Sequence, residues 1–466
     1  MARNLHVVML PWSAFGHIIP FFQLSISLAR NGVRVSFVST PRNIQRLPEL
    51  PPDVSSLVDL VELPLPQLDE NPLPEGAEAT VDISFGEIQY LKIAYDQLKQ
   101  PFEQLIISKC PDWIFIDLIP HWVIEIAQRN EIPIAFFSAY SAAALVFVGP
   151  PYSLFDDGVK RLRPSSESAT VQPPWVDFPS SVAFRGYEAP HFYAGAYGMN
   201  ASGISDVCRL GKILQSCDLV AFRSCTEYEG RYIELYEKLL HKKVIPVGLL
   251  PPERPNEGAS RAESFQWLDG QEPKSVVFVG FGSECKLTKE QVHEIAHGLE
   301  LSGLPFLWAL RRPIWAAHED DVLPEGFVRR TCSRGMVCMG WVPQMEILAH
   351  PSIGGSLFHS GWGSVIETLQ FGHCLVLLPL IVDQPLNARL LAEKGLAVEV
   401  ERKEDGSFTG NEIACAIRLA MVSEEGKELR ANARAAAKIF GDYELHRQYA
   451  TKFVEYLKGN IRKKLH

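Results

Sequence analysis

The alternation of short apolar runs with helical stretches constrains the fold of this chain more than any other feature. Leu5–Leu10 is a short apolar run, the apolar residues of Ile18–Arg30 have helical spacing, and Val33–Val38 is rich in β-branched residues. A strand, a helix and a strand in that order form a βαβ unit, whose two strands lie parallel. We therefore expect a doubly wound α/β domain, with further strands at 113–116, 132–137 and 219–222.

The alternation stops near residue 250 and then begins again. Residues 246–262 are rich in proline, glycine and charged residues, a composition typical of a linker. After it we expect strands at 276–279, 306–309, 336–339, 356–358 and 375–378, with a helix at 289–301. The expected organisation is a first domain at 1–245, a linker at 246–262, a second α/β domain at 263–443, and a C-terminal helix at 444–466 that packs back on the first domain.

Composition and charge exclude several partners. The formal net charge of −10 argues against nucleic acid or an anionic membrane surface as the main partner. No run approaches the roughly 18 apolar residues that a membrane-spanning helix needs, and Leu5–Leu10 is too short for the apolar region of a signal peptide. The nine cysteines form no C-x-x-C pair, which favours a reducing compartment. We expect a cytoplasmic monomer.

Residues 341–384 hold the strongest functional signal. A strand that ends at Phe358 runs into His359, and the small residues Gly361, Gly363 and Ser364 follow at the start of a helix. Backbone N–H groups at a helix N-terminus favour a phosphate, and the imidazole of His359 adds a donor for the same anion.

Two more residues of this segment suggest that the phosphate belongs to a nucleotide. Glu367, one turn into the expected helix, can accept hydrogen bonds from ribose hydroxyls, and Trp341 offers a flat ring on which a base can stack. Each feature alone also fits an ordinary helix end or a core residue. Their combination at these spacings indicates a nucleotide site.

The segment from Trp341 to Gln384 resembles the secondary product glycosyltransferase box, the donor-site signature of plant UDP-dependent glycosyltransferases. The resemblance extends over the whole chain and includes the Gly16-His17 step and the Phe281–Ser283 triplet. It implies a GT-B fold, in which two Rossmann-like domains face each other across a cleft. It also implies transfer of a sugar from a UDP-sugar, with inversion, to a hydroxyl of a small molecule that the N-terminal half binds.

The resemblance also implies roles for individual residues. Trp341 stacks on uracil, with the Val342 backbone and Gln344 beside it, and Glu367 holds the ribose. The residues implied at the diphosphate are Ser283, His359 and Ser364, at the turn that contains Gly361 and Gly363, and those implied around the sugar are Trp362, Asp383 and Gln384.

An alcohol is a weak nucleophile at neutral pH, so transfer to a hydroxyl needs a base. We expect His17 in the loop between the first strand and the first helix, where a parallel sheet presents residues to a ligand. Asp117 ends a buried strand and can orient the imidazole, whereas Asp112 precedes that strand and lies at the opposite edge. The resemblance supports both assignments. The alternatives are a structural histidine and a helix-capping aspartate.

The sequence contains no D-x-D triplet, so we expect no metal and no cofactor beyond the UDP-sugar co-substrate. In the family that the chain resembles, glutamine at the position of Gln384 usually accompanies glucose transfer. UDP-glucose is therefore the favoured donor, with UDP-rhamnose and UDP-xylose left open.

The acceptor is less constrained. Gly363 stands where most of the family has asparagine, and Ser360 where most have cysteine. The glycine variant resembles the branch that extends sugar chains on glycosides of flavonoids, terpenoids or steroids. Glucosylation of an aglycone hydroxyl and a UDP-sugar epimerase are the alternatives. A nicotinamide oxidoreductase would need G-x-G-x-x-G after the first strand, which is absent, and a non-catalytic binder would need neither His17 nor Asp117.

Overall fold

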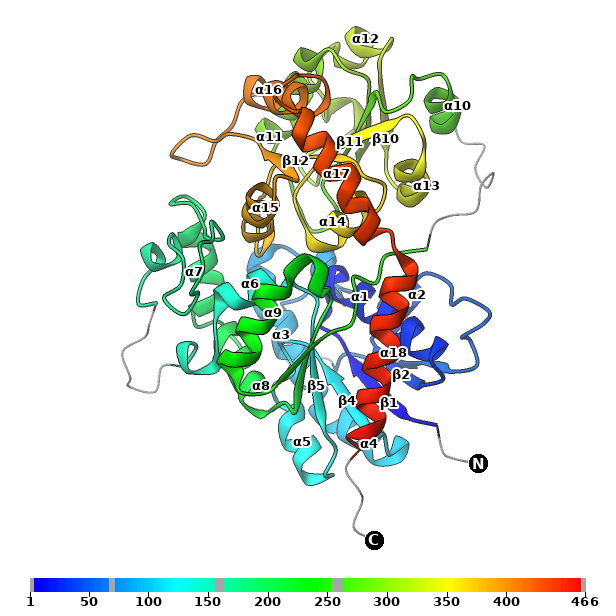
Figure 1. The fold of residues 1–466 in the computed structure, drawn as a ribbon, viewed down its shortest axis with the longest axis vertical. Coiled ribbons are helices and arrows are strands. Elements are labelled where there is room, and N and C mark those ends of the chain that lie inside the picture. The colour runs from blue at the N-terminus through cyan, green and yellow to red at the C-terminus, as the bar shows by residue number, and fades with distance from the viewer. Residues whose placement is uncertain (1–3, 67–71, 156–162, 254–262, 462–466) are drawn as a thin grey trace. The chain divides into compact units, whose positions relative to one another are not determined.

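A computed structural model describes residues 4–66, 72–155, 163–253 and 263–461 of the chain (Figure 1). The chain folds into two compact units, neither of which is a continuous stretch of sequence. The N-terminal unit consists of residues 1–178, 190–250 and 443–466, and the C-terminal unit of residues 179–189 and 251–442. Of the expected linker, residues 254–262 lie outside the described residues, as do residues 462–466 of the expected C-terminal helix.

The N-terminal unit contains a seven-stranded parallel sheet with the strand order β3-β2-β1-β4-β5-β6-β7. The strands are β1 (His6–Leu10), β2 (Arg34–Ser39), β3 (Val58–Glu62), β4 (Trp113–Ile116), β5 (Ile134–Ser138), β6 (Leu219–Phe222) and β7 (Lys243–Pro246). The helices are α1 (Phe15–Arg30), α2 (Pro41–Gln45), α3 (Ile88–Asp96), α4 (Lys99–Lys109), α5 (Val123–Arg129), α6 (Ala142–Val148), α7 (Ala189–Tyr197), α8 (Asp206–Ser216), α9 (Thr226–Leu240) and α18 (Tyr443–Gly459).

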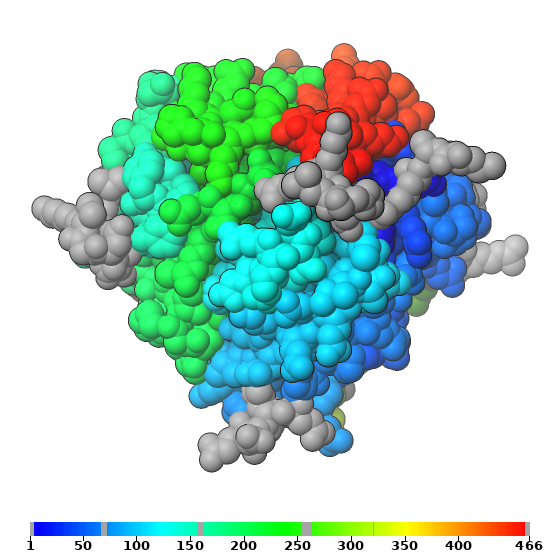
Figure 2. Space-filling model, turned by 90° about the horizontal axis from the view of Figure 1, so that it is seen from below, coloured from blue at the N-terminus to red at the C-terminus, as the bar shows by residue number. Residues whose placement is uncertain are grey.

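The C-terminal helix α18 completes the core of the N-terminal unit. Phe453 and Leu457 are fully buried in the same cluster as the apolar faces of α1 and β1. The ring of Phe453 lies edge-on to Phe115 of β4 at 5.9 Å, and the indole of Trp113 donates to the Leu457 carbonyl at 3.2 Å. Figure 2 shows the red C-terminal segment directly beside blue N-terminal residues and the green segment of the same unit.

The C-terminal unit contains a six-stranded parallel sheet with the order β10-β9-β8-β11-β12-β13. The strands are β8 (Val276–Gly280), β9 (Phe306–Leu310), β10 (Gly335–Met339), β11 (Ile353–Phe358), β12 (Cys374–Leu377) and β13 (Ala397–Glu399). The helices are α10 (Glu263–Asp269), α11 (Lys289–Ser302), α12 (Phe327–Thr331), α13 (Gln344–Ala349), α14 (Trp362–Leu369), α15 (Gln384–Glu393), α16 (Gly410–Met421) and α17 (Lys427–Phe440).

A short segment that lies between two parts of the N-terminal unit in sequence, residues 179–189, packs instead on the C-terminal unit. Its Glu188 carboxylate receives two hydrogen bonds from the guanidinium of Arg389 on α15, at 2.8 and 2.9 Å. Ser181 donates its backbone N–H to Glu393 of the same helix at 2.7 Å. No composition signal predicts this exchange.

The boundary after β7 also differs from the expectation. The sequence predicts a linker from residue 246, but Pro246 ends β7 and residues up to Leu250 belong to the N-terminal unit. Val247 and Leu249 are fully buried, so their apolar side chains hold this stretch in the fold.

Each sheet has one point at which the strand order reverses direction, and ligands of open parallel sheets bind beyond the carboxyl ends of the strands at such a point. In the N-terminal unit it lies between β1 and β4, and in the C-terminal unit between β8 and β11. The expected residues His17 and Asp117 follow the first pair of strands, and Ser283 and His359 follow the second pair.

Candidate active site

His17 lies in the first turn of α1, which begins at Phe15. The prediction that it lies in a loop before the helix is wrong, because the N–H groups of His17 and Ile18 both donate to the Ala14 carbonyl at 2.8 Å and start the helix early. The helix fixes the backbone of His17, so only the side-chain torsions remain to be set. A base in a helix is therefore held more firmly than one in a loop.

The carboxylate of Asp117 binds the imidazole of His17. Asp117 directly follows β4, and Leu10 at the end of β1 pairs with Ile116 in the sheet register, so the segments after the two strands lie side by side. Asp117 Oδ2 lies 2.8 Å from His17 Nδ1, and the two side chains are only 1% and 11% exposed. The expected pair is thus brought together by the fold.

The hydrogen bond determines which ring nitrogen of His17 can act as a base. A carboxylate can only accept, so the proton of the neutral ring is assigned to Nδ1 and the lone pair to Nε2. The ring also lies edge-on to Tyr140 at a centroid distance of 5.2 Å, which restricts its rotation. The imidazole can therefore take a proton at Nε2 while Asp117 stabilises the imidazolium that forms.

Backbone donors hold the Asp117 carboxylate in turn. Its Oδ2 accepts the Trp12 N–H at 3.0 Å and its Oδ1 accepts the Leu118 N–H at 2.7 Å. The expected alternative, in which Asp117 caps the next helix, is wrong because α5 starts at Val123 with Trp122 as its N-cap. Asp112 binds the His6 N–H at the opposite edge of the sheet, as expected.

In the C-terminal unit, two glycines form a cradle for the ring of His359. A Cβ at Gly282 would lie 2.9 Å from its Cε1, and a Cβ at Gly361 would lie 2.7 Å from its Nε2. Gly282 also has a φ of +66°, a conformation that favours glycine. Gly282 in the Phe281–Ser283 triplet and Gly361 in the turn after β11 therefore both leave space for this imidazole.

His359 is buried and electrically neutral in this state. Burial lowers the pKa of its imidazole from 6.5 to about 4. Its Nδ1 is buried without a hydrogen-bond partner among the described residues. Because a buried polar group without a partner is costly, this nitrogen is a place where a ligand can improve the energy of the site.

The helix α14 starts at Trp362, with Gly361 as its N-cap. The Val365 N–H donates to the Gly361 carbonyl at 3.0 Å, which is the first hydrogen bond of this helix. In an α-helix, the N–H groups before this bond point out of the N-terminal end. The start of α14 follows His359 closely in the chain, and binding of an anion at this helix end stays a prediction.

Glu367 and Gln344, both predicted at the nucleoside, hold each other. Gln344 Nε2 donates to Glu367 Oε2 at 2.7 Å, and this bond joins α13 to α14. Val342 is half-buried, whereas Trp341 is 83% exposed. An indole so exposed contributes little to the core and presents a ring face on which a base can stack.

The residues predicted around the sugar are mainly internal in this structure. Trp362 is 3% exposed and its ring contacts Phe440 of α17. Gln384 is 5% exposed, and its Oε1 accepts the N–H groups of Leu380 and Ile381 at 3.0 Å. Asp383 accepts a hydrogen bond from Asn387 at 2.8 Å. Their side chains thus shape the loop before α15, and a direct contact with a sugar stays a prediction.

Ser360, which departs from the family pattern, ties two turns of this region together. Its hydroxyl donates to the Gln384 carbonyl at 2.7 Å, and its own carbonyl accepts from Asn387 at 3.1 Å. Ser360 and Val382 both have a left-handed backbone, with φ of 62° and 54°. Such a conformation is strained for a β-branched residue like Val382 and is found preferentially at binding sites.

Sequence reasoning missed the supporting roles of four residues: Gly282, Val382, Asn387 and Trp12, whose ring was a candidate for the acceptor pocket but whose backbone N–H binds Asp117. Only Gly282 had a signal, since it lies inside the Phe-Gly-Ser triplet that was noted. The others act through a backbone N–H, a backbone torsion or an amide in a helix interior, none of which a residue type reveals.

Among the described residues, no cluster of three or more histidine, cysteine or acidic side chains could hold a metal ion. Over the same residues, no helix is both long enough and apolar enough to cross a membrane.

Comparisons with known proteins agree with this geometry. The model of the family described as UDP-glucoronosyl and UDP-glucosyl transferase matches residues 255–442. UDP-glycosyltransferase 91A1 of Arabidopsis thaliana is 44% identical over 466 residues, which cover 98% of this chain and 97% of that protein. Soyasaponin III rhamnosyltransferase of Glycine max is 42% identical, with 98% and 96% covered.

A more distant relative has a name that states its acceptor. Beta-D-glucosyl crocetin beta-1,6-glucosyltransferase of Gardenia jasminoides is 34% identical, with 91% of this chain and 92% of that protein covered. Among solved structures, the chain is similar to Glycyrrhiza uralensis UGT73P12 complexed with glycyrrhetinic acid 3-O-monoglucuronide. That likeness has a TM-score of 0.78 at 24% identity, covers 98% of this chain and 96% of the other, and shows that the fold is shared.

Proposed function

Since the chain belongs to the plant UDP-dependent glycosyltransferase family, it transfers a sugar from a UDP-sugar to an acceptor, and we propose that the sugar is glucose and the acceptor a sugar hydroxyl of a small-molecule glycoside. The observation that carries the catalytic part of this proposal is the buried His17–Asp117 pair. A binding protein would not need a base, and a base held in one orientation suits proton removal from an alcohol.

In the proposed reaction, His17 Nε2 takes the proton of the acceptor hydroxyl while that oxygen forms a bond to the anomeric carbon. The bond from this carbon to the diphosphate oxygen breaks, and UDP leaves with the electron pair. One displacement inverts the anomeric centre. The Asp117 carboxylate stabilises the imidazolium. The N–H groups at the start of α14, together with His359, donate hydrogen bonds that stabilise the negative charge developing on UDP.

The donor residues that we propose follow this chemistry. Trp341 stacks on uracil beside the Val342 backbone, and Glu367 turns from Gln344 to the ribose hydroxyls. We assign the diphosphate to Ser283, His359, Gly361, Gly363 and Ser364, and the sugar to Trp362, Asp383 and Gln384. Because Gln384 holds two backbone amides, its effect on the choice of sugar can act through the shape of the loop as well as through contact.

We propose that no divalent metal takes part. The support is the lack of a D-x-D triplet in the sequence, together with a helix start and a histidine that offer donors to the diphosphate. Turnover should survive removal of divalent ions with a chelator. A more than tenfold loss that magnesium or manganese restores would contradict the proposal.

The donor sugar needs a direct test, because the 42% identical soybean relative is named a rhamnosyltransferase. Gln384 favours glucose only through its position in the family motif. Initial rates are compared with UDP-glucose, UDP-rhamnose and UDP-xylose at equal concentration, and we expect the highest rate with UDP-glucose. A higher rate with either of the other two would identify that sugar nucleotide as the preferred donor.

The acceptor proposal has two supports. Glycine at 363 removes the side chain that most relatives carry beside the expected diphosphate, which gives a bulky, polar acceptor more room. The Gardenia relative is named for transfer to a glucosyl compound. A mixture of a glucoside and its aglycone, supplied with UDP-glucose, should yield mainly the diglycoside. A clear preference for the aglycone would favour the alternative acceptor, and epimerised UDP-sugar without acceptor would favour an epimerase.

A further inference from the structure

The segment that carries Asp117 borders a pocket on one side. It runs from Asp117 to Trp122, between β4 and α5, and has no regular structure. His121 and Trp122 line a cavity of about 750 Å³ in the N-terminal unit, together with side chains of α3, α8 and the loop at 199–205. Buried side chains such as Ile119 and Trp122 also hold the segment, so hydrogen bonds on the pocket side can add to its orientation.

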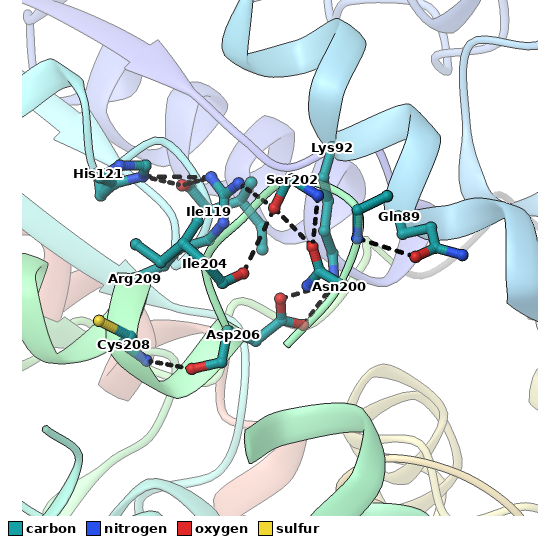
Figure 3. A network of polar contacts seen from close by, with 12 residues as sticks. Gln89, Lys92, Ile119, His121, Asn200, Ser202, Ile204, Asp206, Cys208 and Arg209 are labelled. Atoms are coloured by element: carbon teal, nitrogen blue, oxygen red, sulfur yellow. Dashed lines mark hydrogen bonds and ion pairs between the residues drawn. The ribbon is translucent and has the colours of Figure 1, made fainter. Parts of the chain in front are cut away.

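Arg209 of α8 supplies these hydrogen bonds. It is 0% exposed, and its Nη1 donates to the Ile119 carbonyl at 3.1 Å, two residues beyond Asp117. The same Nη1 lies 3.2 Å from His121 Nδ1 (Figure 3). A guanidinium can only donate, so we assign the proton of the neutral His121 ring to Nε2. Arg209 thus holds the segment at two points.

The same guanidinium also binds a second segment, the end of α3, which is connected to Asp117 by further hydrogen bonds. It forms two hydrogen bonds with the Asp96 carboxylate at the end of α3, at 2.7 and 2.5 Å. The preceding residue, Tyr95, donates its hydroxyl to the Pro11 carbonyl at 2.6 Å. The next residue after Pro11 is Trp12, whose N–H binds Asp117. Paired, planar hydrogen bonds of this kind fix orientation as well as distance.

We propose that Arg209 is a positioning residue for the reaction, which keeps the Asp117 carboxylate on Nδ1 of His17 by joining the segment after β4 to the end of α3. This rests on the proposed roles of His17 and Asp117. Arg209 touches neither of them, and it acts through Ile119, His121 and Asp96.

The proposal has a consequence for the pH dependence of transfer. A carboxylate beside an imidazole favours the imidazolium, so loss of the Asp117 contact lowers the pKa of His17. The rising limb of kcat/KM then moves to lower pH while its plateau falls. Tyr140, on the segment after β5, is the other titratable side chain described against the imidazole.

His121 titrates in the same segment but would respond in the opposite direction. Burial and then the Arg209 charge lower the pKa of His121. Removal of that charge raises the pKa of His121, so a limb that belonged to His121 would move to higher pH. In Arg209→Gln, the direction of the shift therefore identifies the group. In Asp96→Asn it does not, because the Asp96 charge raises the pKa of His121 and its loss would also move a His121 limb to lower pH.

The test compares Arg209→Gln and Asp96→Asn with a matched control, Arg223→Gln. Arg223 is 1% exposed in the same unit and donates to the Leu249 carbonyl at 2.9 Å, but it makes no described contact with residues 117–122. For each variant, the amount of folded enzyme is set by titration with UDP, and kcat/KM is measured against pH. We expect Arg209→Gln to lower the plateau about tenfold and to move the limb about 0.5–1 unit to lower pH. Asp96→Asn should lower the plateau by a smaller factor.

Arg223→Gln should lower the unfolding temperature and leave the limb in place. An unchanged limb in folded Arg209→Gln would overturn the positioning role, as would a shift to higher pH. Where Arg209→Gln does not bind UDP, an unchanged plateau in Asp96→Asn would overturn it. His17→Ala, run in parallel, separates the two levels of the argument. If that variant keeps its turnover, the proposed base is wrong, whereas an inactive His17→Ala with no shift in the Arg209 variants refutes only the positioning role.

Discussion

The two candidate site regions differ in how far their polar groups are satisfied before a ligand arrives. In the N-terminal unit, Asp117 accepts from His17 and from two backbone N–H groups, and the pair is almost fully buried. In the C-terminal unit, His359 Nδ1 is buried without a partner among the described residues, and Trp341 is 83% exposed. A base works best when its geometry exists in advance, whereas groups that bind a nucleotide gain by pairing only when it is present.

Of the variants that test this difference between the two regions, removal of the base should have the largest effect. His17→Ala should lower kcat by about 10²–10⁴-fold, because a positioned general base contributes a factor of this size. The affinity for UDP should be unchanged, since the donor residues belong to the other unit. Turnover by product formation and UDP binding by calorimetry check the two statements. Near-wild-type turnover would mean that His17 is not the base, and Asp117→Asn should cost less than His17→Ala.

Removal of the expected ribose acceptor should affect the other region alone. Glu367→Ala should weaken UDP and UDP-sugar binding by about 2 kcal/mol, or roughly thirtyfold, because hydrogen bonds to a charged group are lost. Glu346→Ala is the matched control: it removes a carboxylate from the adjacent helix α13, and this side chain forms no described hydrogen bond. Equal UDP affinity in wild type and Glu367→Ala would remove the ribose assignment.

The buried histidines of the C-terminal unit give it a pH-dependent stability. Burial holds the pKa of His359 near 4 and that of His373 near 3, below the usual 6.5. The unfolded chain therefore binds more protons below pH 6.5, so the stabilising contribution is complete above that pH and is lost as the pH falls towards 4. Each residue should cost about 2 kcal/mol of unfolding free energy by about pH 5.

Bound UDP should change this pH dependence through one histidine only. A diphosphate beside His359 favours its protonated form, so saturating UDP should reduce the loss of stability on acidification. Urea unfolding of wild type, His359→Gln and His373→Gln between pH 7 and pH 5 tests this. The effect of UDP should vanish in His359→Gln and persist in His373→Gln. If it persists in both, His359 does not meet the diphosphate.

The smallest effect expected is at the exposed indole. Trp341→Ala should weaken UDP binding about tenfold, the value of one base stacked on one aromatic ring, and should leave the unfolding temperature unchanged. Trp362→Ala should instead leave the affinity for UDP unchanged and lower the free energy of unfolding by about 3–5 kcal/mol, because its ring is buried. Calorimetry measures the UDP affinity of the two variants, and thermal unfolding measures their stability. A stability loss in Trp341→Ala would mean that its ring packs in the protein core and does not serve as a stacking surface.

The sequence predicted the strands of both sheets well where apolar runs were long. The expected strands 113–116 and 219–222 match β4 and β6, whereas β3, β7 and β13 were missed. These three lie at the edges of their sheets, and half-buried edge strands such as Val58–Glu62 carry a weak apolar pattern. The α1 start was placed too late, since Ala14 provides no capping side chain to mark it. Predicted pairing succeeded for His17 with Asp117 because both follow neighbouring strands of one parallel sheet.

Contacts that depend on the path of the chain could not be predicted. The Gln344–Glu367 bond, the glycine cradle around His359 and the ion pair of Glu188 with Arg389 each join segments whose separation in sequence carries no information about distance. The assignment of residues 179–189 to the C-terminal unit belongs to the same class.

The place of α18 in the N-terminal unit has a consequence for how the protein is made. Protein synthesis begins at the N-terminus, and domains usually fold in the order in which they emerge from the ribosome. Here the core around Phe115 lacks Phe453 and Leu457 until nearly the whole chain has been translated. The first unit to be synthesised is thus among the last to be completed, so a nascent chain must keep an unfinished apolar face while the second unit folds. A premature stop codon before Tyr443 would remove α18 from that face, and we expect the exposed apolar core of the N-terminal unit to promote aggregation.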